Sequence, residues 1–250
     1  MDKNKENGLS IIEIMVALLL SSLIILGVTQ IYIDNKRSYL FQQSQIDNSD
    51  AARFAVIFLE NELNKIGFRR RPDLGIEQVF NTDANDGLQS GQTAKAITDG
   101  IAYRYQASHP DLTSCDGKAI NLIPSEPYVG INAAINVSRI VFEDGALKCD
   151  DETILDNIAD FKLLYAVGAR SDGGRTIKEF TENPQPSDEI RGVKYEILFA
   201  SPSANLTDIK ENVIYRDWRK RHHNEDNATP PDGRIYQVAS NTIIFRNVTP

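Results

Sequence analysis

One apolar stretch near the N-terminus constrains this chain of 250 residues more than any other feature. Residues 14–33 are apolar enough to form a helix that, at about 1.5 Å per residue, crosses the roughly 30 Å hydrocarbon core of a bilayer. Serine and threonine hydroxyls within it can bond back to the preceding helical turn. The run flows into Lys36 and Arg37 without a small-residue cleavage site. We interpret it as a retained membrane-spanning helix and not as a cleaved secretory signal.

Glu13 is the one ionisable residue in the run of residues 8–33. A charged side chain inside a bilayer costs about 2.5–3.5 kcal/mol on insertion scales, so such residues usually face a partner. No Lys, Arg or His lies between residues 5 and 36, and the run itself therefore offers no counterion. Cleavage after Gly8 would place a new α-amino group on Leu9, about one helical turn before the carboxylate. Such a cut would create the missing positive charge.

These residues resemble the signal of type IV prepilins and pseudopilins: a short polar leader, Gly8, an apolar Leu9, and Glu13 at the head of a long apolar helix. The resemblance implies that prepilin peptidase cuts between Gly8 and Leu9 and N-methylates Leu9. It also implies that Glu13 pairs with an N-terminal amine, its own or that of a neighbouring subunit. Leu9 stands where Phe is commoner, and the leader, residues 1–8, mixes lysines with acids, which weakens the positive-inside signal. An ordinary anchor with an incidental glutamate is the alternative interpretation.

The helix is expected to continue beyond the membrane, because the pattern turns amphipathic in residues 34–67. Gly67 is a natural C-cap, and Pro72 lies beyond it, so one helix near residues 9–66 is predicted. Residues 69–71, all arginine, are interpreted as a solvated helix end, with a nucleic-acid or lipid contact as the alternative. The apolar positions that recur at three- and four-residue steps are Ala52, Ala55, Leu59, Leu63 and Ile66.

Gly27 lies inside the predicted helix and has two interpretations. Glycine costs about 1 kcal/mol in a helix interior, so the helix can loosen there. A small residue also lets a neighbouring helix approach closely. The sequence leaves both open.

Strand-like segments dominate the chain after residue 100, and residues 72–100 are expected to be a largely irregular connection. A hairpin is predicted at Asp144 and Gly145. Together the strands predict a mainly antiparallel sheet laid on the upper helix, and thus an α+β fold. The predicted strands are residues 101–106, 139–143, 146–149, 161–166, 193–201, 235–238 and 242–247.

Cys115 and Cys149 are the two cysteines of the chain. If the domain lies outside the cytoplasm, they are candidates for a disulfide that closes a loop of about 35 residues and stabilises it by about 3–4 kcal/mol. Two buried free thiols are the alternative. Two cysteines without a histidine at ligand spacing do not make a zinc site, so we expect no metal and no cofactor.

No catalytic set is visible. The histidines His109, His222 and His223 lie in segments rich in Pro, Asp or Asn, and carboxylates sit in turns such as residues 171–174, where Asp serves turn geometry. No dinucleotide, Walker or nucleophile-elbow motif occurs. Assembly is therefore expected, and a membrane-anchored enzyme is the distant alternative.

The net charge of −8 argues against a generally DNA-binding surface. A binding module would need an exposed basic or aromatic patch, and Trp218 beside the cations of residues 219–221 is the one place to look. Residues 217–233 are interpreted as a variable loop. Metal binding by His222 and His223 is not expected, since adjacent side chains on a strand point apart.

The order of the later segments, residues 160–168, 193–201 and 232–247, resembles the minor pilins of the PilW family, which are related to J-type pseudopilins. The resemblance implies a type IV pilin-like fold, with a long N-terminal helix and an antiparallel β-sheet C-terminal domain. It divides the chain into a leader (1–8), a transmembrane and filament-core half-helix (9–33), an amphipathic half-helix (34–67) and a globular domain (68–250).

The same resemblance implies a minor pilin that primes or caps a type IV pilus used in twitching motility. A J-type pseudopilin of type II secretion is the alternative. The implied partners are other minor pilins, the major pilin, prepilin peptidase, the inner membrane and a tip adhesin. Before assembly the protein would be a single-pass inner-membrane protein with a periplasmic domain, and afterwards part of the pilus at the cell surface.

Overall fold

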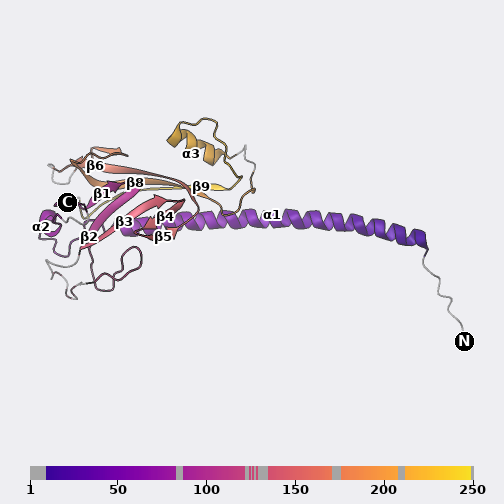
Figure 1. Cartoon of the computed structure of the whole chain (residues 1–250), viewed down its shortest axis with the longest axis horizontal. Coiled ribbons are helices and arrows are strands. Elements are labelled where there is room, and N and C mark those ends of the chain that lie inside the picture. The colour runs from indigo at the N-terminus through magenta and orange to yellow at the C-terminus, as the bar shows by residue number, and fades with distance from the viewer. Residues whose placement is uncertain are drawn as a thin grey trace.

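A single long helix and a two-sheet domain make up the architecture (Figure 1). The computed structural model describes residues 10–82, 87–121, 124, 126, 128, 135–170, 176–207 and 212–248. Helix α1 (Ile11–Leu63) carries the domain on its C-terminal half, and its N-terminal half projects away from it. The α+β class, the long helix and the antiparallel strands are therefore confirmed.

Two antiparallel sheets are present, whereas one was expected. The first has the order β1-β2-β3-β4-β5 and the second the order β7-β6-β8-β9. The chain leaves the first sheet between β5 and β6, where Asn157 has a positive φ of 58° and turns the backbone. The strands are β1 (Ala94–Ile97), β2 (Gly100–Gln106), β3 (Ile135–Glu143), β4 (Ala146–Cys149), β5 (Glu152–Leu155), β6 (Ile158–Ala169), β7 (Glu179–Thr181), β8 (Asp188–Ala200) and β9 (Tyr236–Ile244).

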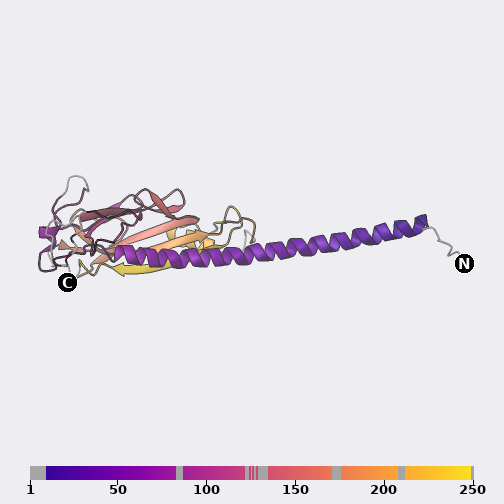
Figure 2. The same cartoon turned by 90° about the horizontal axis from the view of Figure 1, so that it is seen from below.

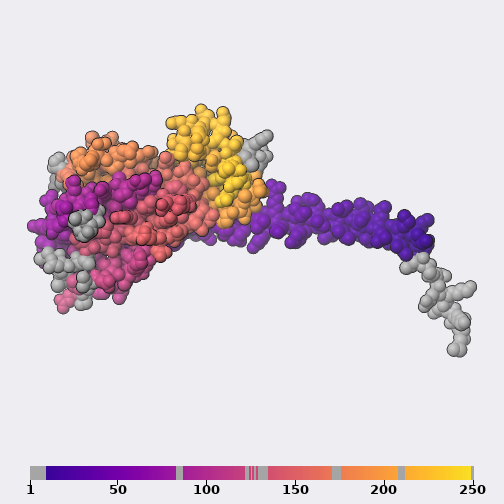
Figure 3. Space-filling model, in the orientation of Figure 1, coloured from indigo at the N-terminus to yellow at the C-terminus, as the bar shows by residue number. Residues whose placement is uncertain are grey.

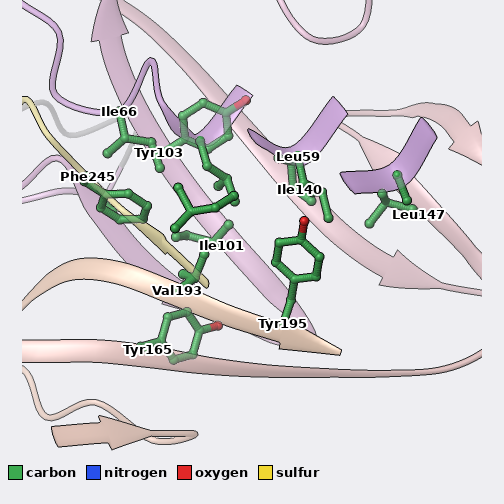
Figure 4. Close-up of a cluster of buried hydrophobic side chains, with 14 of the residues drawn as sticks. Leu59, Ile66, Ile101, Tyr103, Ile140, Leu147, Tyr165, Val193, Tyr195 and Phe245 are labelled. Atoms are coloured by element: carbon green, nitrogen blue, oxygen red, sulfur yellow. The ribbon is translucent and has the colours of Figure 1, made fainter. Parts of the chain in front are cut away.

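The core lies between α1 and the sheets (Figure 4). Leu59 from α1, Tyr103 from β2 and Val193 from β8 are all buried there. Each such side chain contributes about 1.5–3 kcal/mol by leaving water. The amphipathic pattern of the second half-helix is confirmed, because its predicted apolar positions are all buried: Ala52, Ala55, Leu59, Leu63 and Ile66.

Polar contacts fix α1 against each sheet. Glu62 is buried and accepts hydrogen bonds from Lys65 Nζ (2.6 Å) and the Tyr103 hydroxyl of β2 (3.1 Å). Burial, together with the nearby Glu62 carboxylate, raises the pKa of Tyr103 well above its ordinary value. On the second sheet, Asn48 Nδ2 donates to the carbonyl of Ile235 over 3.0 Å. The helix is thus held at two places along its length.

The predicted end of the helix is close to the observed one. Regular α1 stops at Leu63, and Gly67 follows in the left-handed region with φ 72°. A Cβ at Gly67 would lie 2.8 Å from Val248 Cγ2, so a larger residue does not fit without movement. The Gly67 amide donates to the Arg104 carbonyl of β2 over 3.0 Å, which ties the helix end to the first sheet.

The hairpin prediction is confirmed. Strands β3 and β4 pair antiparallel with Glu143 opposite Ala146, and both turn residues have positive φ, Asp144 54° and Gly145 74°. The C-terminal prediction of two strands is wrong, since β9 is continuous. Its small and polar residues around Ser240 stay in the ladder, because pairing to β8 uses backbone groups whatever the side chain.

Residues 72–100 are more ordered than expected, since they contain the short helix α2 (Ile76–Val79) and strand β1. The cause is Arg104, a fully buried side chain of β2. Its guanidinium donates to four main-chain oxygens of this connection. Because Arg104 lies outside residues 72–100, the sequence of this connection alone does not indicate that it is ordered. The acceptors are the carbonyls of Gln92 (2.7 Å), Asn81 (2.8 Å), Phe80 (3.2 Å) and Gln89 (2.6 Å).

The interpretation of residues 69–71 as a solvated helix end is wrong for Arg70, which is 5% exposed. Its guanidinium reaches the next connection of the chain. Arg71 does remain near the surface, where it pairs with Asp73 over 2.6 Å. The acceptors of Arg70 are the carbonyls of Ala107 (3.2 Å), Ser108 (2.8 Å), Pro124 (3.0 Å) and Glu126 (2.6 Å).

Arg191 of β8 is a third buried arginine of this kind. It donates to the carbonyls of Ala169 (2.6 Å) and Thr176 and pairs with Glu189 (3.0 Å). Arg70, Arg104 and Arg191 are all buried. Because a guanidinium has five donors, each can hold several carbonyls of one connecting segment.

The expected variable loop of residues 217–233 begins inside a helix, α3 (Val213–His223). Asn212 caps it by accepting from the Tyr215 amide over 3.1 Å, and Asn224 ends it in the left-handed conformation with φ 56°. The helix packs on the second sheet near β9 (Figure 1). The helix was not predicted because its sequence is mostly charged and only Trp218 of it is buried.

Candidate assembly site

The projecting half of α1, residues 11–39, is exposed along its whole length, and we call it the bare segment. Of the described helix, every residue before Tyr39 is exposed, Ile11 at 79% and Leu26 at 67%, and the first buried residue is Ser44. Figure 3 shows this part as a single rod without cover from the domain. Among the described residues α1 alone is long and apolar enough to cross a membrane, with a mean hydropathy of 2.7 in its most apolar window. An uncovered apolar surface of this size needs lipid or other helices around it.

The serine and threonine hydroxyls of residues 14–33 are satisfied locally, as expected. Ser21 donates to the carbonyl of Ala17 over 2.7 Å, and Thr29 donates to that of Ile25 over 2.7 Å. Ser22 bonds in the same way to Leu19. These bonds satisfy the hydroxyls of Ser21, Ser22 and Thr29 within the helix itself, as an apolar medium requires.

Glu13 is the exception in this segment. It lies in the first turn of α1, which begins after Ser10 without a side-chain cap. Across the described residues, no ion pair or hydrogen bond to the Glu13 carboxylate is found. The predicted processing residues Gly8 and Leu9 lie outside the described residues, so cleavage between them stays a prediction. The described residues therefore offer this carboxylate no counterion, and its pairing with an N-terminal amine stays a prediction.

Gly27 lies midway along the bare segment, and α1 runs through it without interruption. A Cβ built at this position meets nothing within 4 Å. The glycine is therefore not required by any contact within the described chain. Loosening of the helix and close approach of a neighbouring helix both stay predictions.

Cys115 and Cys149 form a disulfide, with their Cα atoms 5.9 Å apart. It ties the connection after β2 to strand β4, and both residues are buried. Asp150 lies beside the two sulfurs, which gives the only group of described residues with metal-ligand spacing. Because both sulfurs are in the disulfide, they are not thiolates that could bind a metal.

The aromatic part of the expected patch is not exposed, whereas Lys220 and Arg221 are exposed. Trp218 is fully buried among residues of β8 and β9, and its Nε1 donates to Asp160 Oδ2 of β6 over 2.8 Å. The three cations that follow it are each paired. The pairs are Arg219 with Glu225 (2.5 Å), Lys220 with Asp226 (2.9 Å) and Arg221 with Glu196 (3.2 Å).

His222 and His223 lie at the end of α3 and not in a loop. His222 Nε2 is 3.1 Å from Glu196 Oε2 of β8, and His223 Nε2 is 2.6 Å from Asp160 Oδ2. Burial raises the pKa of Asp160, but hydrogen bonds from Trp218 and His223 outweigh it, so the pKa ends below its ordinary value. These histidines hold the helix on the sheet by pairing with its acids.

No family model matches this chain, and no curated protein matches it. Among solved structures the chain is similar to a type IV-like pilin from Thermus thermophilus. That similarity has 13% sequence identity and a TM-score of 0.43, and it covers 81% of this chain and 98% of the other. A likeness of this size assigns neither a family nor a function.

The sequence interpretation missed the polar residues that work inside the domain. Arg104 and Arg191 each stand in a strand between apolar neighbours, which is the one local sign that an arginine is buried. Asp160 lies near the start of β6, and its local sequence does not indicate that it bonds to both Trp218 and His223. These contacts depend on packing between distant segments.

Proposed function

We propose that this chain is a pilin-type assembly subunit, a minor pilin of the PilW kind that joins other minor pilins to prime or cap a type IV pilus. The observation that carries the proposal is the bare half of α1, which is as long as a bilayer is thick and continues directly into the half that the β domain covers. Such a helix is suited to being held by lipid before assembly and by other helices after it.

In this proposal residues 1–8 are a leader and residues 9–33 are the membrane and filament-core segment. Residues 34–67 carry the domain, residues 68–250, which lies in the periplasm before assembly and at the cell surface afterwards. Prepilin peptidase at the inner membrane removes the leader and methylates Leu9. The domain then contacts other minor pilins, the major pilin and a tip adhesin.

Glu13 sets the axial position of the subunit. Removal of the leader creates an α-amino group on Leu9, and this amine or that of a neighbouring subunit pairs with the carboxylate. Two opposite charges attract far more strongly in a low dielectric than in water. A carboxylate left without a partner there is correspondingly costly, so misaligned subunits are rejected.

DNA is not part of the proposal. The cations that follow Trp218 are engaged by acids of the same chain, and the net charge is −8. Phosphate binding depends on clustered Lys and Arg that release counterions from the nucleic acid. The described surface of α3 offers no such cluster of unengaged cations.

The intact mass of the protein extracted from its own membranes tests the proposal. We expect a chain that begins at Leu9 and carries one added methyl group. A chain that still begins at Met1, without modification and outside any fibre, would overturn it. The mass also tests the alternative of an ordinary membrane anchor, which would keep all 250 residues.

A further inference from the structure

Strand β9 ends the second sheet, and no strand of the described residues neighbours one of its two edges. The Phe245 amide donates to the Arg191 carbonyl over 2.7 Å, and the Ser201 amide donates to the Ile235 carbonyl over 2.8 Å. With the register of β8 and β9, these bonds place the odd-numbered residues of β9 in the ladder. The backbone groups of its even-numbered residues therefore point outward. We call these the β9 edge: the N–H and C=O groups of Val238, Ser240, Thr242 and Ile244.

The described residues leave most of the β9 edge without a partner. No hydrogen bond from another described residue reaches the backbone of Val238, Ser240 or Ile244. The Thr242 amide is capped locally by the Asn241 side chain, Oδ1, over 2.8 Å. The β9 edge is thus a row of backbone donors and acceptors. An incoming strand could replace the Asn241 side chain as the acceptor for the Thr242 amide.

The other sheet edges are protected in ways that β9 is not. Strands β1 and β5 have four residues each and carry Lys95 and Glu152, and β5 also has an irregular register with β4. Strand β7 has three residues and carries Glu179. Short length, charge and bulges are the usual protections of an edge against pairing. Strand β9 has nine residues, no charge and a continuous register, so it is suited to receive another strand.

Helix α1 covers one face of β9 and leaves its edge open. Ala239 and Ile243 on the covered face are buried, whereas Ser240 and Thr242 on the other face are exposed. The strand runs alongside the helix in the same direction (Figure 2). Two contacts show this direction: Asn48 of α1 bonds to Ile235, and further along the helix the Asn64 carbonyl accepts from Asn247.

A second copy of this chain does not suit the β9 edge. Two copies of β9 paired about a two-fold axis would be antiparallel, and their helices, which run with β9, would point in opposite directions. Both could not then enter one membrane. A pair centred on Ser240 would also place Arg234 opposite Arg246, and like charges directly opposite are destabilising. Pairing β9 with another edge of a second copy would offer at most four residues.

We propose that the β9 edge receives an extended strand from a different polypeptide, a neighbouring subunit of the assembly whose own helix enters the same membrane or fibre. This strand contributes backbone hydrogen bonds to Val238, Ser240, Thr242 and Ile244 and extends the second sheet by one strand. Acidic residues beside it would face Arg246, which is exposed at the end of β9. The inference rests on the proposed function, since it supplies the contact by which the domain joins its neighbour.

Proline at Ser240 tests the edge. Its nitrogen points outward, so Ser240→Pro removes an outward N–H without breaking the ladder to β8, as prolines on edge strands do. The matched control is Ser240→Val, which keeps the N–H and favours a strand. In cells producing the full chain, we expect Ser240→Pro to reduce recovery in sheared fibres by about ten-fold or more, and Ser240→Val to match wild type.

A second comparison tests whether an amide that points outward differs from one that bonds to β8. Asn241→Pro removes an N–H that belongs to the ladder with β8, so it should lower the melting temperature of the domain. Ser240→Pro should leave that temperature close to wild type. If Ser240→Pro melts as wild type and still enters fibres normally, the edge proposal is wrong.

Amide exchange measures the same contact without a substitution. In the isolated full chain in detergent, the amides of Val238, Ser240 and Ile244 should exchange much faster than those of Ala239 and Ile243. In isolated fibres the outward amides should become protected. Equal exchange in chain and fibre would overturn the β9 edge while leaving the proposed function intact. A wild-type chain that loses no leader and enters no fibre would overturn the proposed function itself, and with it this contact.

Discussion

The indole Nε1 of Trp218 donates a hydrogen bond to Asp160 Oδ2 over 2.8 Å and so joins α3 to strand β6. The same carboxylate oxygen is 2.6 Å from Nε2 of His223, which lies near the C-terminal end of α3. Because Trp218 is the one tryptophan of the chain and is fully buried, its fluorescence reports directly on whether α3 is docked.

Trp218→Ala should release α3 from the sheet. The substitution removes the largest side chain of the small cluster with Leu198, Ala200 and Tyr236. Truncations of this kind cost about 3–5 kcal/mol of unfolding free energy. Denaturant unfolding followed by circular dichroism measures the loss. Val213→Ala, at a half-exposed position of the same helix, is the control and should change little; an equal loss in both variants would contradict the role of Trp218.

Acid should weaken the same contact. The pKa of Asp160 lies below its ordinary value of 3.8, since hydrogen bonds from Trp218 and His223 outweigh the effect of burial. A carboxylate with a lowered pKa stabilises the folded state fully above that ordinary value, and this stability is lost as the pH falls through the folded value. Trp218 fluorescence should therefore report the undocking of α3 as the pH falls below about 4.

Asp160→Asn provides the control for the acid prediction. Asparagine keeps an oxygen acceptor for the indole but does not titrate in this range. The acid-dependent part of the fluorescence change should disappear in this variant. An unchanged acid transition would mean that another group controls the docking of α3.

Reduction of the Cys115–Cys149 disulfide should destabilise the domain. The bridge closes a loop with a sequence separation of 34, for which chain-entropy models give about 3–4 kcal/mol. Melting curves with and without reductant measure the effect. The double variant Cys115→Ala and Cys149→Ala should melt at the temperature of the reduced wild type, and reductant should not change its melting temperature. Identical melting of the wild type in both conditions would show that no bridge forms in solution.

Arg104→Met should loosen the connection after α2. The substitution leaves buried carbonyls without donors, at a cost of about 1–3 kcal/mol for each group that water does not reach. Arg104→Lys should be intermediate, because an ammonium has fewer donors and no planar fork. Amide exchange of residues 80–92 measures the local effect. Arg139→Met, at an exposed position of β3, is the control.

Glu13→Ala should separate membrane insertion from assembly. Without the carboxylate the helix is more apolar, so insertion and leader removal should persist, but the pairing that aligns subunits is lost. Recovery in sheared fibres, compared with recovery in membranes, measures the difference. Asp34→Ala, which removes an exposed acid bonded to Gln30, is the matched control. Normal fibre incorporation of the Glu13 variant would contradict the role of this residue in register.

The local patterns in the sequence predicted the parts of the fold that depend on local rules. The three- and four-residue spacing from Ala52 to Ile66 predicted the covered face of α1, because helix geometry alone places these residues together. The turn at Asp144 and Gly145 was predicted for the same reason, since both residues tolerate positive φ. The exposed half of α1 could be predicted because its length and apolar composition can be read directly from the sequence.

Contacts between distant segments could not be predicted in this way. Arg70 reads as surface charge in its own sequence, yet it is buried because carbonyls from residues 107–126 surround its guanidinium. Arg221 follows Trp218 in a basic run, yet it pairs with Glu196 of the distant strand β8. The β9 edge likewise exists only because β9 comes last in the order of the second sheet.

The buried arginines Arg70, Arg104 and Arg191 hold connecting segments of the domain by donating hydrogen bonds to the main-chain oxygens of those segments. Every amino acid supplies the same oxygen, so substitutions along these segments leave the fastening in place. Side chains along these segments can therefore vary without loss of the arginine hydrogen bonds that hold their backbone.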